Sequence, residues 1–242
     1  MPARTPLAKL DALDSLRLRD RWVYEPNESA WLQSWLRPGM RFADVGAHIG
    51  YYSAMAGRMV GPSGWGIAFE PEPENFAALR LNVAGLPVNC VMAAVTGPGS
   101  PPLELVRNPR NSGDNWVMPR IKGEQIPAIN LDRHLSLINH PQIDFLKIDT
   151  QGHEARILSG ASGTLSSVQA ALVEVYPLGL ARYGDEPRSI FSLAIAAGLG
   201  LYSVVGAAAG KTPSRLTEEE AIAMSPAGRH WNVLLLREGL RP

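Results

Sequence analysis

The sequence DVGAHIG, residues 44–50, decides how this chain is interpreted. It follows a short apolar run, Arg41 to Val45, and it precedes a helical pattern. Glycine lets the backbone turn tightly and approach a ligand closely. Free N–H groups at the start of a helix are donors for such a ligand. We therefore expect a strand, a ligand-binding turn and a helix, in that order.

The spacing of the glycines argues against a dinucleotide site. That fingerprint needs glycine at the first, third and sixth places. Counted from Gly46, those places hold Gly46, His48 and Tyr51, so only one of the three matches. An NAD-dependent reductase therefore remains only a distant alternative.

Two acidic residues indicate a different ligand. Asp44 lies two residues before the first glycine, and Glu70 closes a second apolar run, Trp65 to Phe69. The carboxylate of Asp44 would repel a pyrophosphate but suits a ligand that carries an amino group and a sulfonium. Glu70 is placed to accept two hydrogen bonds from ribose hydroxyls. Together these features predict a pocket for a nucleoside joined to methionine.

The rest of the pattern predicts an α/β fold with a mostly parallel sheet, because short apolar runs alternate with helical segments. We expect one domain over 1–242, with an N-terminal helical segment at 1–38 and a catalytic α/β core at 39–242. Two segments, Thr96–Asn115 and Lys122–Ile129, read as irregular, and the first is a candidate substrate lid. The seven expected strands are Arg41–Val45, Trp65–Phe69, Val88–Met92, Ile143–Asp149, Ala170–Val175, Leu201–Val205 and Trp231–Leu236.

Composition narrows the class of protein. The 242 residues carry 23 Lys+Arg and 23 Asp+Glu, and this balance argues against a nucleic-acid or anionic-membrane binder. The single cysteine, Cys90, excludes an intramolecular disulfide and suits a reducing compartment. The start of the chain leads into no apolar signal core, and Gly198–Gly210 is shorter than the ~20 residues of a membrane span. We expect a cytoplasmic protein without membrane partners.

Three motifs in order resemble those of a known family. FADVGAHIGYY (42–52), FEPEPENF (69–76) and DFLKIDTQGHE (144–154) resemble the motifs of FkbM-type S-adenosylmethionine-dependent methyltransferases. The resemblance implies the class I methyltransferase fold, a Rossmann-like three-layer sandwich whose seven-stranded sheet ends in an antiparallel strand. His48 stands where the family commonly has Asn, and Gln151 stands where a Glu often follows the aspartate.

The resemblance also implies an activity, which is methyl transfer from S-adenosyl-L-methionine with S-adenosyl-L-homocysteine as product. O-methylation of a small molecule or glycan is the expected outcome. N-methylation of an amine or peptide side chain is the alternative, and a catalytically silent module is the rival from another class. The residues expected to bind the cofactor are Asp44, Gly46, Ala47, His48 and Gly50 at the methionine end, Glu70 at the ribose and Ala93 beneath the adenine.

Catalytic candidates cluster where two later strands end. Asp149 and Lys147 share a face of one strand, so they form either a buried ion pair or a site that orients the acceptor. A divalent metal held by Asp149 and Glu174 is possible but poorly supported, because two carboxylates make a poor site. His153 is the best histidine for a general base. Glu154 fits either a catalytic role or a helix-dipole partner.

One expectation concerns assembly. Trp31 and Trp35 fall on one side of an amphipathic segment. This pair is buried either in the core or in the face of a homodimer, and the sequence leaves both open.

Overall fold

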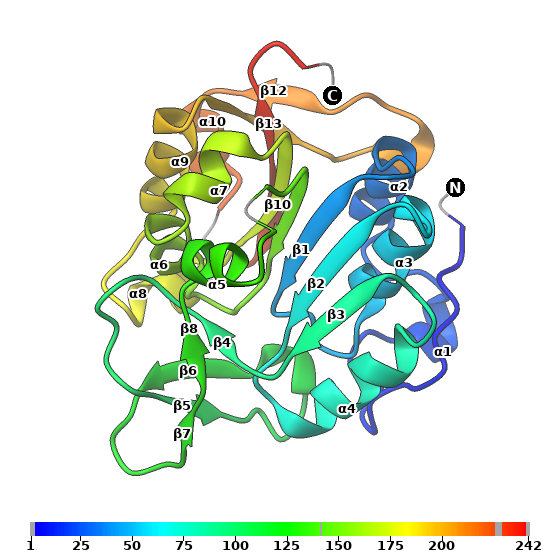
Figure 1. Ribbon diagram of the computed structural model, residues 1–242. Helices are drawn as coiled ribbons and strands as arrows, with labels where there is room; N and C mark the ends of the chain where they lie inside the picture. The colour runs from blue at the N-terminus through cyan, green and yellow to red at the C-terminus, as the bar shows by residue number, and fades with distance from the viewer. Residues whose placement is uncertain (1–2, 141, 226–228, 241–242) are drawn as a thin grey trace.

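The fold is built on one large sheet. The computed structural model describes residues 3–140, 142–225 and 229–240, so the ends of the expected 1–242 domain lie outside the described residues. The strand order is β12-β11-β13-β10-β9-β1-β2-β3 (Figure 1). The bounds are β1 (Arg41–Val45), β2 (Trp65–Phe69), β3 (Val88–Val91), β9 (Phe145–Ile148), β10 (Ala170–Val175), β11 (Leu199–Ser203), β12 (Ser214–Leu216) and β13 (Trp231–Arg237).

The direction of the strands confirms the predicted fold class. Neighbours from β10 to β3 pair in parallel, whereas β13 runs antiparallel to both β10 and β11. The predicted number of seven strands is corrected to eight, because β12 adds to the edge beside β11. The sequence gives no signal for β12, since it is three residues long and Ser214 and Arg215 are exposed.

Helices cover both faces of the sheet and make three layers (Figure 1). The helices α2 (Pro26–Trp35), α3 (Tyr51–Val60) and α4 (Pro73–Asn82) cover one face. The other face carries α5 (Leu131–Leu137), α6 (Glu154–Ser159), α7 (Ser162–Ser167) and α9 (Pro187–Ala196). The shorter helices are α1 (Leu18–Arg21), α8 (Pro177–Ala181) and α10 (Glu218–Ala223).

The segment expected to be a lid has its own structure. A small antiparallel sheet forms here from three strands in the order β6-β5-β7. The strands are β5 (Leu103–Val106), β6 (Trp116–Pro119) and β7 (Gln125–Ile126). A further pair, β4 (Ala94–Val95) and β8 (Ala128–Ile129), joins it to the core. The expectation of irregular loops is therefore wrong here. These strands are short and partly exposed, so they lack the apolar runs that identify the strands of the main sheet.

The tryptophan pair belongs to the core side of α2. The rings of Trp31 and Trp35 stack with centroids 5.4 Å apart, and both contact the ring of Phe145 in β9. Trp31 is buried. This packing explains the pair without a dimer, and the homodimer stays a prediction. Among the described helices, none has both the length and the apolar character that crossing a bilayer requires.

The face of the sheet beneath α2 and α3 changes character along the strands. It begins with the aromatic rings of Phe42 and Phe145. Since side chains on one face recur every second residue, the next positions are Asp44 and Lys147, which are neighbours in the β1–β9 pair. An apolar core therefore gives way to charged groups at the carboxyl ends of the strands.

Candidate active site

A cavity of about 240 Å³ opens at the carboxyl ends of β1, β2, β9 and β10. The chain runs outward from β1 to β3 and then crosses back to β9, so the switch point of the topology lies between β1 and β9. Ligands of open α/β sheets bind at this point. Most of the residues expected from the sequence line the cavity, namely Asp44, Gly46, Ala47, His48, Glu70, Ala93, Asp149 and Glu174.

The glycine turn lines the cavity, but three of its N–H groups already have acceptors within the protein. The N–H groups of Gly46 and Ala47 donate to the carbonyl of Phe69 at 3.0 and 2.9 Å. The N–H of His48 donates to Glu70 Oε2 at 2.8 Å. These three N–H groups are therefore not free for a ligand, whereas no acceptor among the described residues takes the N–H groups of Ile49 or Tyr51 at the start of α3. Gly50 lies outside the cavity lining: it precedes α3 with a positive φ of 84°, and a Cβ there would lie 2.6 Å from Leu79 Cδ1.

Glu70 is held from both sides at the end of β2. It is 5% exposed, and its Oε1 accepts from the N–H of Glu72 at 2.9 Å. Burial raises the pKa of Glu70 to about 7, although the two backbone hydrogen bonds oppose the shift. A carboxylate has about four lone-pair sites. Two are used by the backbone, so Glu70 keeps acceptor capacity for a ligand in the cavity.

His48 links the glycine turn to two serines, Ser112 and Ser15, which also line the cavity. Its Nε2 lies 2.8 Å from Ser112 Oγ in the turn η1 (Ser112–Asp114) and 3.4 Å from Ser15 Oγ. Ser112 Oγ also donates to Asp11 Oδ2 at 3.0 Å. Burial lowers the pKa of His48, so its ring is neutral at pH 7. Its left-handed backbone (φ 51°) is a strained conformation of the kind found at ligand sites.

One side of the cavity, called its floor from here on, is formed by Lys147, Asp149, Gln151 and Glu174. It carries an ion pair and a side-chain amide that bridges two carboxyl groups. Lys147 Nζ donates to Asp149 Oδ2 at 2.8 Å. Gln151 Nε2 donates to Asp149 Oδ1 at 3.1 Å and to both oxygens of Glu174 at 3.1 and 2.9 Å. The predicted ion pair thus forms, and Asp149 also faces the cavity. A left-handed backbone at Gln151 (φ 60°) brings its amide between the two carboxyl groups.

Charge is unequally shared across this floor. Burial would raise the pKa of Asp149, but the ammonium of Lys147 outweighs burial and holds that pKa below its usual value. Burial, followed by the nearby Asp149, raises the pKa of Glu174 well above its usual value. The floor therefore holds an ionised Asp149 beside the ammonium of Lys147, and a Glu174 carboxyl group that keeps its proton to a higher pH than usual.

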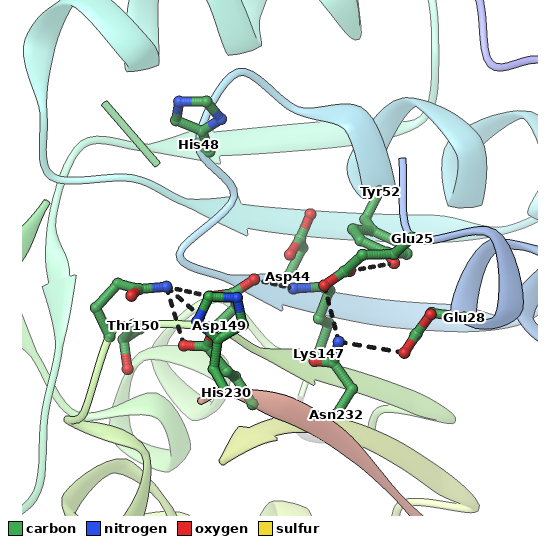
Figure 2. Close-up of polar contacts among 12 residues, drawn as sticks. Glu25, Glu28, Asp44, His48, Tyr52, Lys147, Asp149, Thr150, His230 and Asn232 are labelled. Carbon is green, nitrogen blue, oxygen red and sulfur yellow. Dashed lines mark hydrogen bonds and ion pairs between the residues drawn. The ribbon is translucent and has the colours of Figure 1, made fainter. Parts of the chain in front are cut away.

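Behind the floor, a buried polar network reaches α2 and β13 (Figure 2). Tyr52 OH donates to Glu25 Oε2 at 2.6 Å, and Asn232 Nδ2 donates to Glu25 Oε1 at 2.8 Å. Burial raises the pKa of Glu25. Lys147 Nζ lies 4.7 Å from the centre of the Tyr52 ring. Sequence reasoning did not assign Glu25 or Asn232 to the site, because 207 residues separate them.

His153 and Glu154 do not line the cavity. His153 Nε2 lies 2.7 Å from Thr96 Oγ1, and the ring is 2% exposed. Glu154 Oε1 accepts from the N–H groups of Thr150 and Gly152 at 2.9 and 3.0 Å, and it therefore shapes the loop after β9. The geometry gives both residues a structural role and does not bring the proposed general base to the floor.

This placement of His153 gives a testable prediction. Burial, followed by the charge of Arg156, lowers the pKa of His153 to about 4. Below about pH 6.5 the unfolded chain binds a proton that the folded chain refuses, so stability falls as pH drops toward 4. We expect His153→Gln to reduce that pH-dependent loss by up to about 3 kcal/mol, at ~1.36 kcal/mol per pKa unit. Urea unfolding at pH 6.5, 5 and 4 measures it, and an unchanged pH slope contradicts it.

No group of three or more His, Cys, Asp or Glu side chains within the described ranges is arranged to hold a metal ion. Gln151 Nε2 lies between the two carboxylates proposed for such a site. The cavity also includes residues that the sequence did not suggest, among them Tyr24, Trp116, Gln151 and His230. Trp116 and His230 come from the small sheet and from the start of β13, where no motif marks them.

The strand order and the three layers are those of the class I methyltransferase fold. Its switch-point cavity is bordered by a glycine turn and by two acidic residues at strand ends. Comparison with known proteins identifies the family. The family model for the methyltransferase FkbM domain matches residues 44–215, and this chain belongs to that family.

Individual relatives are more distant. The hexuronic acid methyltransferase AglP of Haloferax volcanii is 24% identical over 151 residues, which are 62% of this chain and 59% of that protein. The precorrin-6y C5,15-methyltransferase of Geobacter metallireducens has a TM-score of 0.50 at 14% identity, over 96% of this chain and 95% of that one. A SAM-dependent methyltransferase of Aquifex aeolicus has a TM-score of 0.45 at 14% identity, over 94% and 99%. The Geobacter structure supports the fold.

Proposed function

We propose that this chain transfers a methyl group from S-adenosyl-L-methionine to an oxygen of a small-molecule or glycan acceptor. The observation that carries the proposal is the convergence of Asp44 and Glu70 on one cavity at the switch point of the sheet. Membership of the FkbM family supports methyl transfer. The name of the curated relative, a hexuronic acid methyltransferase, supports a sugar-like acceptor.

The residues of the cavity fit this cofactor. Asp44 is buried, and its Oδ1 has no hydrogen-bond partner among the described residues, whereas its Oδ2 accepts from Ser53 Oγ at 2.5 Å. A positively charged methionine end offsets the charge of such a buried carboxylate. Glu70 would bind the ribose hydroxyls. Ala93, 2% exposed and without bulk, would lie beneath the adenine.

The chain's own residues act chiefly by positioning. The cofactor, when bound, supplies an electrophilic methyl group on its sulfonium. Displacement at that methyl is in line, so the orientation of the acceptor supplies much of the rate. Asp149 stays ionised and faces the cavity, so it is placed to accept the hydrogen bond of an acceptor hydroxyl and to hold that oxygen in line. Its lowered pKa makes it a weak base before the reaction, so it would take the hydroxyl proton only as the new C–O bond forms and the C–S bond of the sulfonium breaks, which leaves neutral S-adenosyl-L-homocysteine.

Cofactor binding tests the proposal directly. We expect S-adenosyl-L-homocysteine to bind in calorimetric titrations at micromolar concentration and NAD not to bind. Glu70→Gln removes the charge from the ribose hydrogen bonds and should weaken this binding by about 1–3 kcal/mol. Glu74→Gln, at an exposed position on α4, is the matched control and should bind like the wild type. Binding of NAD alone, or equal binding by both variants, contradicts the assignment.

A further inference from the structure

An arginine is held at the border of the cavity by two aromatic rings. The guanidinium carbon of Arg182 lies 4.4 Å from the centre of the Trp116 ring and 5.6 Å from that of Tyr176. Arg182 Nη1 donates to the backbone carbonyl of Gln151 at 3.3 Å. Trp116 and Gln151 both line the cavity. The guanidinium is thus fixed beside the floor, although Arg182 follows α8 on the protein surface.

This guanidinium has no carboxylate partner in the described part of the chain. Two other cations of this region are paired, since Arg107 lies 3.0 Å from Glu72 and Lys147 lies 2.8 Å from Asp149. Arg182 takes part in none of the ion pairs found among the described residues. Within the described residues, the guanidinium makes one hydrogen bond, to the carbonyl of Gln151. An arginine that is stacked but unpaired keeps N–H donors for a ligand.

The negative charge of Asp149 affects which acceptors can enter the cavity, and Arg182 changes that effect. The ionised Asp149 would repel an anionic acceptor that enters the cavity. A guanidinium at the border offsets this repulsion, and its planar fork matches a carboxylate with two parallel hydrogen bonds. Stacking on Trp116 and Tyr176 fixes the side chain in advance, so less rotamer entropy is lost when the ligand binds. The partly exposed faces of these rings suit the apolar side of a pyranose.

We infer that Arg182 binds a carboxylate group of the methyl acceptor, so that this enzyme acts on an acidic sugar or a related carboxylate-bearing hydroxy compound. The inference rests on the proposed function and adds the charge of the acceptor and the residue that recognises it. Arg182 is in this sense a specificity-determining residue, whereas Asp149 orients the reacting oxygen.

The test uses the whole chain saturated with S-adenosyl-L-homocysteine and two probes of matched shape, D-glucuronate and D-glucose. We expect glucuronate to bind at least about tenfold more tightly than glucose in NMR titrations, since ~1.4 kcal/mol from a charge-assisted pair is a factor of ten. Added salt should weaken glucuronate binding alone. Arg182→Gln should abolish the preference, and Arg182→Lys should keep part of it, because the charge remains but the fork is lost.

The control is Arg156→Gln, because Arg156 already pairs with Asp185 at 3.1 Å and, unlike Arg182, stacks on no ring that lines the cavity. It should keep the preference for glucuronate. A preference that survives in Arg182→Gln, or equal binding of the two sugars by the wild type, overturns the inference. If S-adenosyl-L-homocysteine binds and glucuronate does not, only this inference fails. If S-adenosyl-L-homocysteine itself does not bind, the proposed function fails and the inference fails with it.

Discussion

Replacing Lys147 by methionine is expected to lower the free energy of unfolding by about 3–5 kcal/mol at neutral pH. Removing one partner of a buried ion pair leaves the other charge uncompensated, and such changes cost this much. Lys147 is 2% exposed and faces Asp149, Glu25 and Asp44. Methionine has a similar volume, so the loss arises from charge rather than from a cavity.

The same substitution should reverse how stability depends on pH. Without the ammonium, burial raises the pKa of Asp149 above its value in the unfolded chain. A carboxyl group with a raised folded pKa stabilises the fold below its unfolded pKa, and this contribution is lost as pH rises through the folded value. The deficit of Lys147→Met should therefore shrink between pH 7 and pH 5.

Urea denaturation at several pH values measures this deficit. Lys122→Met, at an exposed position in the connection between β6 and β7, is the matched control and should stay within about 0.5 kcal/mol of the wild type. A loss of equal size at pH 5 and pH 7 would show that packing, and not charge, dominates at Lys147.

All strands of the main sheet except the exposed edge strand β12 were predictable, because each of them is a compact apolar run. Phe145 to Ile148 and Ala170 to Val175 are buried along their whole length, and their sequences show it. The small sheet was not predictable. Its strands rest on one partly exposed face, so Leu103 and Val117 are buried while their neighbours are not. Short strands of this kind are specified by tertiary contacts rather than by local pattern.

Part of the site was predictable from the sequence because of the geometry of parallel strands. Asp44 and Glu70 end neighbouring parallel strands, and such ends meet at one edge of a sheet. His153 was expected near Asp149 but does not line the cavity, because the backbone after β9 cannot be predicted from residue spacing. Positive φ values at Gln151 and Gly152 turn the chain, and His153 then packs against Thr96 behind the cavity. No local pattern announces such a turn at a glutamine.

The second large effect is expected at Gly46, the first glycine of the sequence DVGAHIG at residues 44–50. Gly46→Ala is expected to cost about 3–5 kcal/mol of stability and to weaken binding of S-adenosyl-L-homocysteine by more than about tenfold. Gly46 has φ 79°, which costs an L-residue roughly 1–2 kcal/mol. A Cβ there would also lie 1.8 Å from the carbonyl oxygen of Asp149. Overpacking adds about 1–3 kcal/mol, and backbone cannot rotate away as a side chain can.

The control for this substitution separates its two causes. Gly85 has almost the same φ, 78°, but a Cβ there would meet nothing within 4 Å. Gly85→Ala should therefore cost only the backbone term of roughly 1–2 kcal/mol and leave cofactor binding unchanged. Chemical denaturation and calorimetry on both variants give the comparison. If the two variants lose equal stability and bind alike, the contact between Gly46 and Asp149 does not hold β1 and β9 together at the cavity. A larger loss at Gly46 ties the glycine of the first motif to the aspartate of the third through one close backbone contact.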